Sequence, residues 1–213
     1  MNTALVTGGT ARLGRAIADR LRADGWRVLT SSHRADAGAD FVADLSAPMG
    51  AAKLYAAALG ALGGVPPDAL VNNAGLFTGE DEAVEAVNFE SPKKLMTLMA
   101  GREAGRGVVV NILDAAVLSE VSPPSQCSPR YVATKRALHE FTMKAAAMFA
   151  DTLRVNAVAP GPVFAPEGVH EKAAATPLGR PSAEAVADAV AFLLSAESTT
   201  GCTIPVDGGQ HLA

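Results

Sequence analysis

Short apolar runs and amphipathic stretches alternate along this chain. Thr3–Thr7 is an apolar run that ends at a pair of glycines, and after it Leu13, Ile17 and Leu21 recur at helical spacing until Gly25. The first pattern is typical of a buried strand, and the second of a helix with one apolar face. The first 25 residues therefore predict a strand, a tight turn and a helix.

The same alternation predicts further strands at residues 27–30, 41–43, 69–71, 108–113, 154–158 and 203–206. It predicts further helices at residues 51–62, 81–100, 129–150 and 183–194, the second of them interrupted near Ser91-Pro92. Short strands that are apolar on both faces and alternate with helices are the signature of a parallel sheet covered on both sides. We expect one α/β domain over residues 1–213, built on a doubly wound, mostly parallel sheet.

Composition and charge narrow the class of protein. The chain has 213 residues, of which 49% are hydrophobic, so it is large enough for a sizeable core. A net charge of −4 without a basic block argues against nucleic acid or an anionic membrane as partner, and no apolar run has the roughly 18 residues of a membrane span. We expect no signal peptide, because the first residues lack a basic region. Cys127 and Cys202 lie far apart, which predicts reduced thiols in a cytoplasmic protein.

Candidate chemistry lies at the start of the predicted helix near residue 130. Ser128 before Pro129 is typical of a helix N-terminus, and Tyr131 and Lys135 are then one turn apart on one face. A nearby ammonium lowers the pKa of a phenol, ordinarily about 10, by roughly 1–3 units. Such a phenol gives or takes a proton near neutral pH. The spacing alone also fits an ordinary surface Tyr and Lys.

Glycine and asparagine motifs follow several predicted strands. Parallel sheets bind ligands beyond the carboxyl ends of their strands, so these positions are candidate binding residues. The first strand is followed by Thr7-Gly8-Gly9-Thr10-Ala11-Arg12-Leu13-Gly14, where glycines let the backbone approach a pyrophosphate and the helix N-terminus favours its charge. A tight strand-to-helix turn is the alternative. The fourth strand is followed by Asn72-Asn73-Ala74-Gly75, and the sixth by Pro160-Gly161.

In this order and spacing, the motifs together with Asn88 resemble the short-chain dehydrogenase/reductase family over essentially the whole chain, up to the closing Val206-Asp207-Gly208-Gly209. The resemblance implies a Rossmann-type fold and a nicotinamide cofactor. It implies that Tyr131 is the catalytic acid/base, that Lys135 lowers its pKa and holds the nicotinamide ribose, and that Asn88 supports an ordered water leading to Lys135. The other cofactor-binding residues that it implies are Gly8, Thr10, Arg12, Leu13 and Gly14 in the phosphate loop, Asp44 and Leu45 at the adenine, Asn73, Ala74 and Gly75 on the adenosine side, and Pro160, Gly161 and Val163 near the carboxamide.

The end of the second predicted strand indicates which nicotinamide cofactor is used. NAD-dependent relatives carry an acidic residue here, which binds the ribose 2′-hydroxyl, whereas this chain has Ser32, His33 and Arg34. Charge-assisted hydrogen bonds to a 2′-phosphate, roughly 1.5–3 kcal/mol each, predict at least a tenfold preference for NADPH. Asp36 is a competing acidic candidate, but we expect it to lie beyond the strand end in solvent.

Three further departures resemble the pteridine reductase branch of the family. Arg12 replaces the middle glycine of the phosphate loop and adds positive charge. Phe77 stands where an aromatic ring stacks a pterin, with a core phenylalanine as the alternative. Asp114 stands where the family has its catalytic serine, and the alternative is that Asp114 only ends its strand and Ser119 takes that role.

The carboxyl group of Asp114 favours one class of substrate. Reduction of a ketone develops an alkoxide, which a hydroxyl stabilises and a carboxylate repels. Reduction of a pterin C=N bond instead places a proton on nitrogen, which an acid at this position supplies or stabilises. We expect an NADPH-dependent reductase of dihydropterins or dihydrofolate. The alternatives are a general carbonyl or quinone reductase of the same family and a non-catalytic NADP(H)-binding sensor.

The resemblance also bears on assembly and substrate access. It implies a homotetramer formed through the helices near Asn88 and Tyr131 and the last strand. The segment 163–181, a substrate lid in the family, is short here, and the segment between Asp114 and Tyr131 is longer than usual. The histidines show no metal-ligand spacing, so we expect no metal. The family resemblance implies a small-molecule substrate.

Overall fold

A seven-stranded parallel sheet forms the centre of the computed structural model, which describes residues 1–103, 105–119, 128–164 and 176–212. The strand order is β3-β2-β1-β4-β5-β6-β7, and every neighbouring pair is parallel. The strands are β1 (Thr3–Thr7), β2 (Arg27–Ser32), β3 (Phe41–Val42), β4 (Ala69–Asn72), β5 (Gly107–Ile112), β6 (Leu153–Pro160) and β7 (Thr203–Val206).

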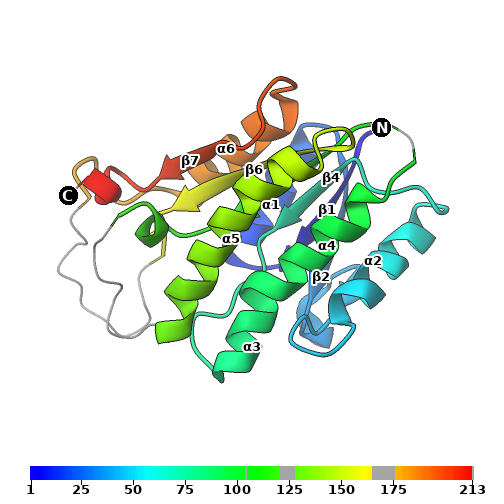
Figure 1. Cartoon of the computed structure of the whole chain (residues 1–213), viewed down its shortest axis with the longest axis horizontal. Coiled ribbons are helices and arrows are strands. Elements are labelled where there is room, and N and C mark those ends of the chain that lie inside the picture. Colours follow the sequence, from blue (N-terminus) through cyan, green and yellow to red (C-terminus); the bar gives the residue numbers. More distant parts are fainter. Residues whose placement is uncertain (104, 120–127, 165–175, 213) are drawn as a thin grey trace.

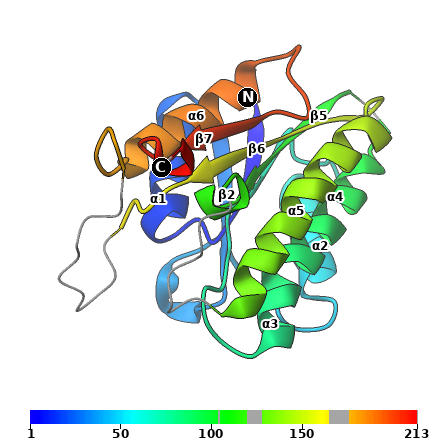
Figure 2. The same ribbon diagram turned by 60° about the vertical axis from the view of Figure 1, so that its left-hand side comes forward.

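Helices cover both faces of the sheet, as Figures 1 and 2 show, with α2, α4 and α5 on one side and α1 and α6 on the other. Their bounds are α1 (Arg12–Ala23), α2 (Gly50–Ala61), α3 (Asp81–Glu85), α4 (Ser91–Ala100), α5 (Pro129–Met148) and α6 (Ala183–Ser195). Four short helical turns complete the described part, namely η1 (Ala35–Ala37), η2 (Ala86–Glu90), η3 (Ala115–Val117) and η4 (Gln210–Leu212). No described helix is long and apolar enough to cross a membrane.

Two apolar cores lie on opposite faces of the sheet because side chains alternate along each strand. In β1, Leu5 faces the core shared with α2, α4 and α5, whereas Ala4 and Val6 face the core shared with α1 and α6. In β4, Leu70 and Val71 divide in the same way. This two-sided burial explains why the strands are apolar throughout, and it confirms the predicted doubly wound fold.

The chain reverses direction across the sheet between β1 and β4, since β1–β3 extend outward on one side and β4–β7 on the other. The carboxyl ends of β1 and β4 therefore lie side by side, with the loops that follow them at Gly8 and Asn73. In open α/β sheets, ligands bind at such a switch point.

The predicted helix over residues 81–100 differs from the structure in the place of its interruption. The break is the π-helical segment η2, which separates α3 from α4, and Ser91-Pro92 begins α4 instead of breaking it. A proline in the first turn of a helix costs little because the N–H group it lacks has no helical partner there. π-helical segments often occur at functional sites, and η2 carries Asn88.

Candidate active site

The N-terminus of α5 is held in place by the serine that the sequence predicted as its cap. Ser128 Oγ accepts a hydrogen bond from the Arg130 N–H at 3.2 Å and donates one to Asp81 at 3.1 Å. Arg130 also forms an ion pair with Glu85. These contacts join the start of α5 to α3 and so set the position of Tyr131, which lies in the first turn.

Tyr131 and Asp114 meet directly. The Tyr131 hydroxyl donates a hydrogen bond of 2.8 Å to Asp114 Oδ2. The other carboxylate oxygen, Oδ1, accepts a hydrogen bond of 2.9 Å from the Ala116 N–H and so caps η3. Asp114 is therefore in contact with the predicted catalytic tyrosine, while the choice between Asp114 and Ser119 for the serine's role stays a prediction. Ser119 lies on the next turn, where its carbonyl accepts a 3.4 Å hydrogen bond from Arg136.

Lys135 is buried behind Tyr131, with 4% of its surface exposed. Its Nζ donates a hydrogen bond of 2.8 Å to the Ile112 carbonyl and lies 5.9 Å from the centroid of the Tyr131 ring. Burial lowers the pKa of Lys135 from 10.5 to about 8, and the charge of Asp114 opposes this shift. The predicted pairing of an amine with the phenol is present in the structure.

Asn88 is fully buried beside Lys135. Its Oδ1 accepts a hydrogen bond from the Leu76 N–H at 2.9 Å, and its Nδ2 donates one to the Leu76 carbonyl at 2.8 Å. A Cβ atom added to Gly75 would lie 3.3 Å from Asn88 Oδ1 and 3.6 Å from Lys135 Nζ. The three predicted residues Gly75, Asn88 and Lys135 therefore converge on one point.

The ring of Phe77 packs against that of Tyr131, the predicted catalytic tyrosine. Its ring centroid is 4.8 Å from that of Tyr131, with 59° between the ring planes, and 41% of the residue is exposed. The alternative of a core phenylalanine is therefore wrong. An exposed aromatic face next to the phenol is available to a planar substrate ring.

The loop after β1 is a tight strand-to-helix turn that needs glycine. Gly8 has a φ of +63°, and a Cβ atom on Gly14 would collide with the Gly8 carbonyl oxygen, so both positions need glycine. The Asn73 carboxamide donates hydrogen bonds to the carbonyls of Thr7 at 2.9 Å and Gly8 at 3.2 Å. Asn73 thus holds the loop in shape, and the binding of a pyrophosphate there stays a prediction.

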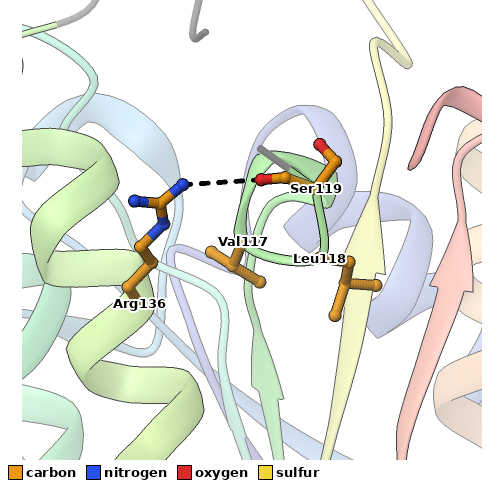
Figure 3. A pocket seen from close by; sticks show the side chains of 4 residues that line it. All are labelled: Val117, Leu118, Ser119 and Arg136. Atoms are coloured by element: carbon orange, nitrogen blue, oxygen red, sulfur yellow. Dashed lines mark hydrogen bonds between the residues drawn. The ribbon is translucent and has the colours of Figure 1, made fainter. Parts of the chain in front are cut away.

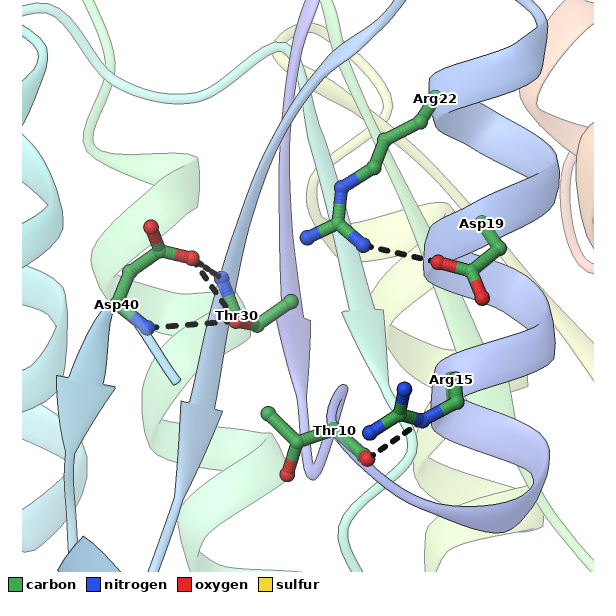
Figure 4. Close-up of polar contacts among 6 residues, drawn as sticks. All are labelled: Thr10, Arg15, Asp19, Arg22, Thr30 and Asp40. Atoms are coloured by element: carbon green, nitrogen blue, oxygen red, sulfur yellow. Dashed lines mark hydrogen bonds and ion pairs between the residues drawn. The ribbon is translucent and has the colours of Figure 1, made fainter. Parts of the chain in front are cut away.

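Arginine side chains surround this loop. Arg15 Nε donates a 2.9 Å hydrogen bond to the Thr10 carbonyl, as Figure 4 shows. Arg12 has a φ of +49°, which is unusual for a residue other than glycine, and its guanidinium carbon lies 4.8 Å above the ring centroid of Phe164. Leu13 points the other way, into the core of α1 and α6.

The end of β2 carries the predicted 2′-phosphate residues. Ser32 Oγ accepts a hydrogen bond of 3.1 Å from the Arg34 N–H. Arg34 forms a forked ion pair with Asp36 through contacts of 3.0 and 2.7 Å, and both side chains are exposed. Arg34 hydrogen-bonds to Asp36 and so lowers the pKa of that carboxyl group. Asp36 is exposed to solvent as predicted, yet its carboxylate is paired with the Arg34 guanidinium, which we expected to bind the 2′-phosphate. His33 is exposed beside them.

The β2 end is also tied to the strand that follows it. Asp40 Oδ2 accepts hydrogen bonds from the Thr30 N–H at 2.7 Å and the Thr30 hydroxyl at 2.8 Å, drawn in Figure 4. Asp44, after β3, accepts a 2.6 Å hydrogen bond from the Ser46 hydroxyl, which lowers the pKa of the Asp44 carboxyl group. The turn that presents His33 and Arg34 is therefore braced at its base.

Leu45 is placed differently from the prediction. Its side chain is buried in the core with α2 and α4, and its carbonyl accepts a 2.8 Å hydrogen bond from Ser91 Oγ. The side chain and the carbonyl are therefore engaged within the protein, so a contact of Leu45 with the adenine would use its backbone N–H, and that assignment stays a prediction.

The loop after β6 lies at the same edge of the sheet. Pro160 ends β6, and a Cβ atom on Gly161 would lie 2.7 Å from Asp207 Cα, so the two chain segments touch there. The Val163 N–H donates a 2.8 Å hydrogen bond to the Gly161 carbonyl. Most of the predicted lid over residues 163–181, and much of the long segment between Asp114 and Tyr131, lie outside the described residues.

Thr7 is a site residue that sequence reasoning missed. Its hydroxyl accepts hydrogen bonds from the N–H groups of Asn73 and Ala74, both at 3.0 Å, and so joins the ends of β1 and β4. A threonine at the end of an apolar strand is common and does not by itself indicate a functional role. These hydrogen bonds were therefore not predictable from the sequence. Among the described residues, no group of three His, Cys, Asp or Glu side chains could hold a metal ion.

Comparison with known proteins defines the class. The sequence profile of the short chain dehydrogenase family matches residues 2–175, so the chain belongs to that family of oxidoreductases. It is 32% identical to a putative ketoacyl reductase 2 of granaticin polyketide synthase from Streptomyces violaceoruber, over 98% of this chain and 96% of that protein. It is 35% identical to L-xylulose reductase from Bos taurus, over 97% of this chain and 95% of that protein.

Two solved structures are similar to this chain in fold over nearly their whole length. The chain is similar to FolM alternative dihydrofolate reductase 1 from Brucella canis, crystallised with NADP, with a TM-score of 0.86 and 31% identity over 100% of this chain and 95% of the other. The corresponding FolM structure from Brucella suis, also with NADP, gives a TM-score of 0.85 and 31% identity.

Proposed function

We propose that this protein is an NADPH-dependent reductase of a C=N bond in a pterin ring, acting on dihydropterins or dihydrofolate. The observation that carries the proposal is the 2.8 Å hydrogen bond between Tyr131 and Asp114. It places a carboxyl group, in place of the family's serine hydroxyl, beside the catalytic phenol. The likeness to NADP-bound dihydrofolate reductases supports the same substrate class.

The phosphate loop and the β2 end fit the cofactor. The glycine cradle at Gly8 and Gly14 suits a pyrophosphate, Arg12 and Arg34 supply positive charge, and His33 supplies a further polar side chain. When bound, NADPH supplies the hydride. The family resemblance assigns the nicotinamide ribose to Lys135, whose amine is held by its hydrogen bond to the Ile112 carbonyl.

The protein's own residues handle the proton and the substrate ring. Tyr131 and Asp114 share a proton along their hydrogen bond, and the pair can deliver it to a ring nitrogen. A carboxylate at this point stabilises a protonated nitrogen and opposes a developing alkoxide. Phe77 offers the ring face against which a flat heterocycle stacks.

The test follows NADPH oxidation with 7,8-dihydrobiopterin, with dihydrofolate and with a panel of ketones and quinones, for the natural protein, Asp114→Asn and Asp114→Ser. We expect turnover of the pterins and a loss of about 10²–10⁴-fold in both variants, because each removes an acid–base group. Asp114→Ser restores the family's usual hydroxyl, so its ketone activity should equal or exceed that of the natural protein.

The alternative function is a general carbonyl reductase. The observation that favours it is the 35% identity to L-xylulose reductase and the 32% identity to a putative ketoacyl reductase. Turnover of ketones by the natural protein without any turnover of pterins would establish this alternative. Absence of turnover with every substrate would instead favour the cofactor-binding sensor.

A further inference from the structure

A cavity of about 480 Å³ lies beside the active site and is not used by the chemistry described above. It is lined by Val117, Leu118 and Ser119, from the turn that begins at η3, and by Arg136 of α5. Figure 3 shows Arg136 reaching from the helix toward this turn. The volume lies in the range of small-molecule sites.

One wall of this cavity is continuous with Asp114. Asp114 caps η3 with the oxygen that Tyr131 does not use, and the N–H of Val117, the last residue of that turn, donates a 3.1 Å hydrogen bond to the Asp114 carbonyl. The other wall is Arg136 of α5, which donates to the Ser119 carbonyl just after this turn. The cavity therefore begins one helical turn from the residue whose carboxylate contacts Tyr131.

The charge of Arg136 is available to a ligand. Its guanidinium donates one hydrogen bond, 3.4 Å long, to the Ser119 carbonyl, and among the described residues no carboxylate lies within ion-pair distance. Glu140, one turn further along α5, lies 4.0 Å from Lys144 instead. A guanidinium with a single long hydrogen bond can donate two further hydrogen bonds to a carboxylate in a bidentate contact.

The remaining lining is partly apolar. Val117 and Leu118 add aliphatic side chains to the lining, and in Figure 3 Val117 lies on the side that faces Arg136, with Leu118 further from it. A cation beside an aliphatic wall recognises an anion that is attached to an apolar or aromatic body. The two pterins considered above differ in this respect, since dihydrofolate carries an aromatic benzoyl group ending in glutamate carboxylates, whereas dihydrobiopterin carries a short uncharged side chain.

We infer that the cavity between η3 and Arg136 is a subsite for the benzoylglutamate arm, which makes dihydrofolate the preferred substrate over unconjugated dihydropterins. The substrate preference in this inference rests on the proposed pterin reductase function. The binding of the arm itself does not depend on turnover, so the two claims can be tested separately.

The experiment measures the dissociation constant of p-aminobenzoylglutamate by calorimetry, and the KM values of dihydrofolate and dihydrobiopterin, for the natural protein, Arg136→Gln and Lys144→Gln. Lys144→Gln removes one positive charge from the same exposed helix, two turns from Arg136, and is the matched control. We expect Arg136→Gln to weaken the fragment and raise the KM of dihydrofolate about tenfold or more, because it removes a charge-assisted contact. The KM of dihydrobiopterin in Arg136→Gln should stay within about twofold of that of the natural protein. The dissociation constant and both KM values of Lys144→Gln should also stay within about twofold, roughly the scatter of surface substitutions.

Absence of fragment binding, or an equal change for both substrates in Arg136→Gln, would overturn the inference. Equal effects of Lys144→Gln would also overturn it, because they would show a general field effect of helix charge. Fragment binding that depends on Arg136, without turnover of either pterin, would support the subsite and refute the proposed function.

Discussion

Asp114 serves two purposes at the scale of a single residue. One carboxylate oxygen accepts a hydrogen bond from the Tyr131 hydroxyl, and the other caps the turn that begins at Ala115. The second contact fixes the orientation of the first, since a capped carboxylate cannot rotate away without leaving the Ala116 N–H unpaired. The acid beside the phenol is therefore held in place before substrate arrives.

Arg34 and Asp36 form a second pair with opposing effects. The forked contact places a carboxylate on the cation that we expect to bind the cofactor's 2′-phosphate. A phosphate that approaches Arg34 must displace this carboxylate or accept its repulsion. On this assignment we expect Asp36 to compete with the 2′-phosphate of NADPH for Arg34.

This competition predicts opposite results for two substitutions. Arg34→Ala should raise the KM of NADPH about tenfold or more and leave that of NADH within twofold, because only the phosphate loses a charge-assisted contact. Asp36→Asn should lower the KM of NADPH, since it frees Arg34. Steady-state kinetics with both cofactors measures these effects. Equal losses for NADPH and NADH in Arg34→Ala would contradict the assignment, and weaker NADPH binding in Asp36→Asn would show that the carboxylate instead positions the arginine.

At the scale of elements, a buried arginine joins β6 to α6. The Arg154 guanidinium donates hydrogen bonds to the carbonyls of Leu193 at 3.0 Å, Leu194 at 2.9 Å and Thr199 at 2.9 Å. The last carbonyls of a helix have no partner within the helix, so this side chain acts as the C-terminal cap of α6. It also fixes the turn that leads into β7.

Arg154→Met should therefore lower the free energy of unfolding by about 1–3 kcal/mol, because it leaves buried carbonyls without donors. Urea denaturation followed by circular dichroism measures the change. Arg106→Met, an exposed arginine at the start of the neighbouring strand, is the matched control and should change stability by less than about 0.5 kcal/mol. Similar stability of the two variants would mean that water replaces the lost donors.

The local pattern predicted the elements well. Strands such as Thr3–Thr7 and Thr203–Val206 have the bounds expected from the apolar runs, and helix α5 begins at the predicted Ser128 cap. The interruption before α4 was misplaced, because Ser91-Pro92 reads as a break in the sequence, although proline in a first turn is well tolerated. Of the four short helical turns, η2 lies inside the predicted helix over residues 81–100, whereas η1, η3 and η4 were not predicted. In η3 the turn depends on a cap from the Asp114 carboxylate, which the apolar pattern does not show.

At the scale of the whole molecule, the sheet brings together residues that the chain separates widely. The ends of β1, β4 and β5 supply Gly8, Gly75 and Asp114, and the two helical layers close the cores on either side. The amine of Lys135 is buried at the meeting point of these ends. The homotetramer implied by the family resemblance stays a prediction.

Burial of Lys135 links the stability of the whole domain to pH. Its pKa is about 8 in the folded protein and has an ordinary value of 10.5. Below pH 8 both states carry the proton and folding bears the full cost of burying the charge, whereas between pH 8 and 10.5 the unfolded state binds more protons, so this group makes stability rise with pH.

Urea denaturation across this range should show the effect. The free energy of unfolding of the natural protein should rise between pH 8 and 10.5 relative to that of Lys135→Met, which lacks the titrating group. Parallel profiles for the two proteins would show that Lys135 keeps an ordinary pKa in the fold.

Local patterns along the chain were enough to predict the doubly wound sheet, the order of its loops and the pairing of Tyr131 with Lys135, because strand alternation and helix periodicity are properties of neighbouring residues. The contact of Asp114 with Tyr131, the burial of the Leu45 side chain and the cavity beside Arg136 became visible with the folded chain. Those outcomes depend on how separate elements pack, and packing directions cannot be read from spacing along the chain.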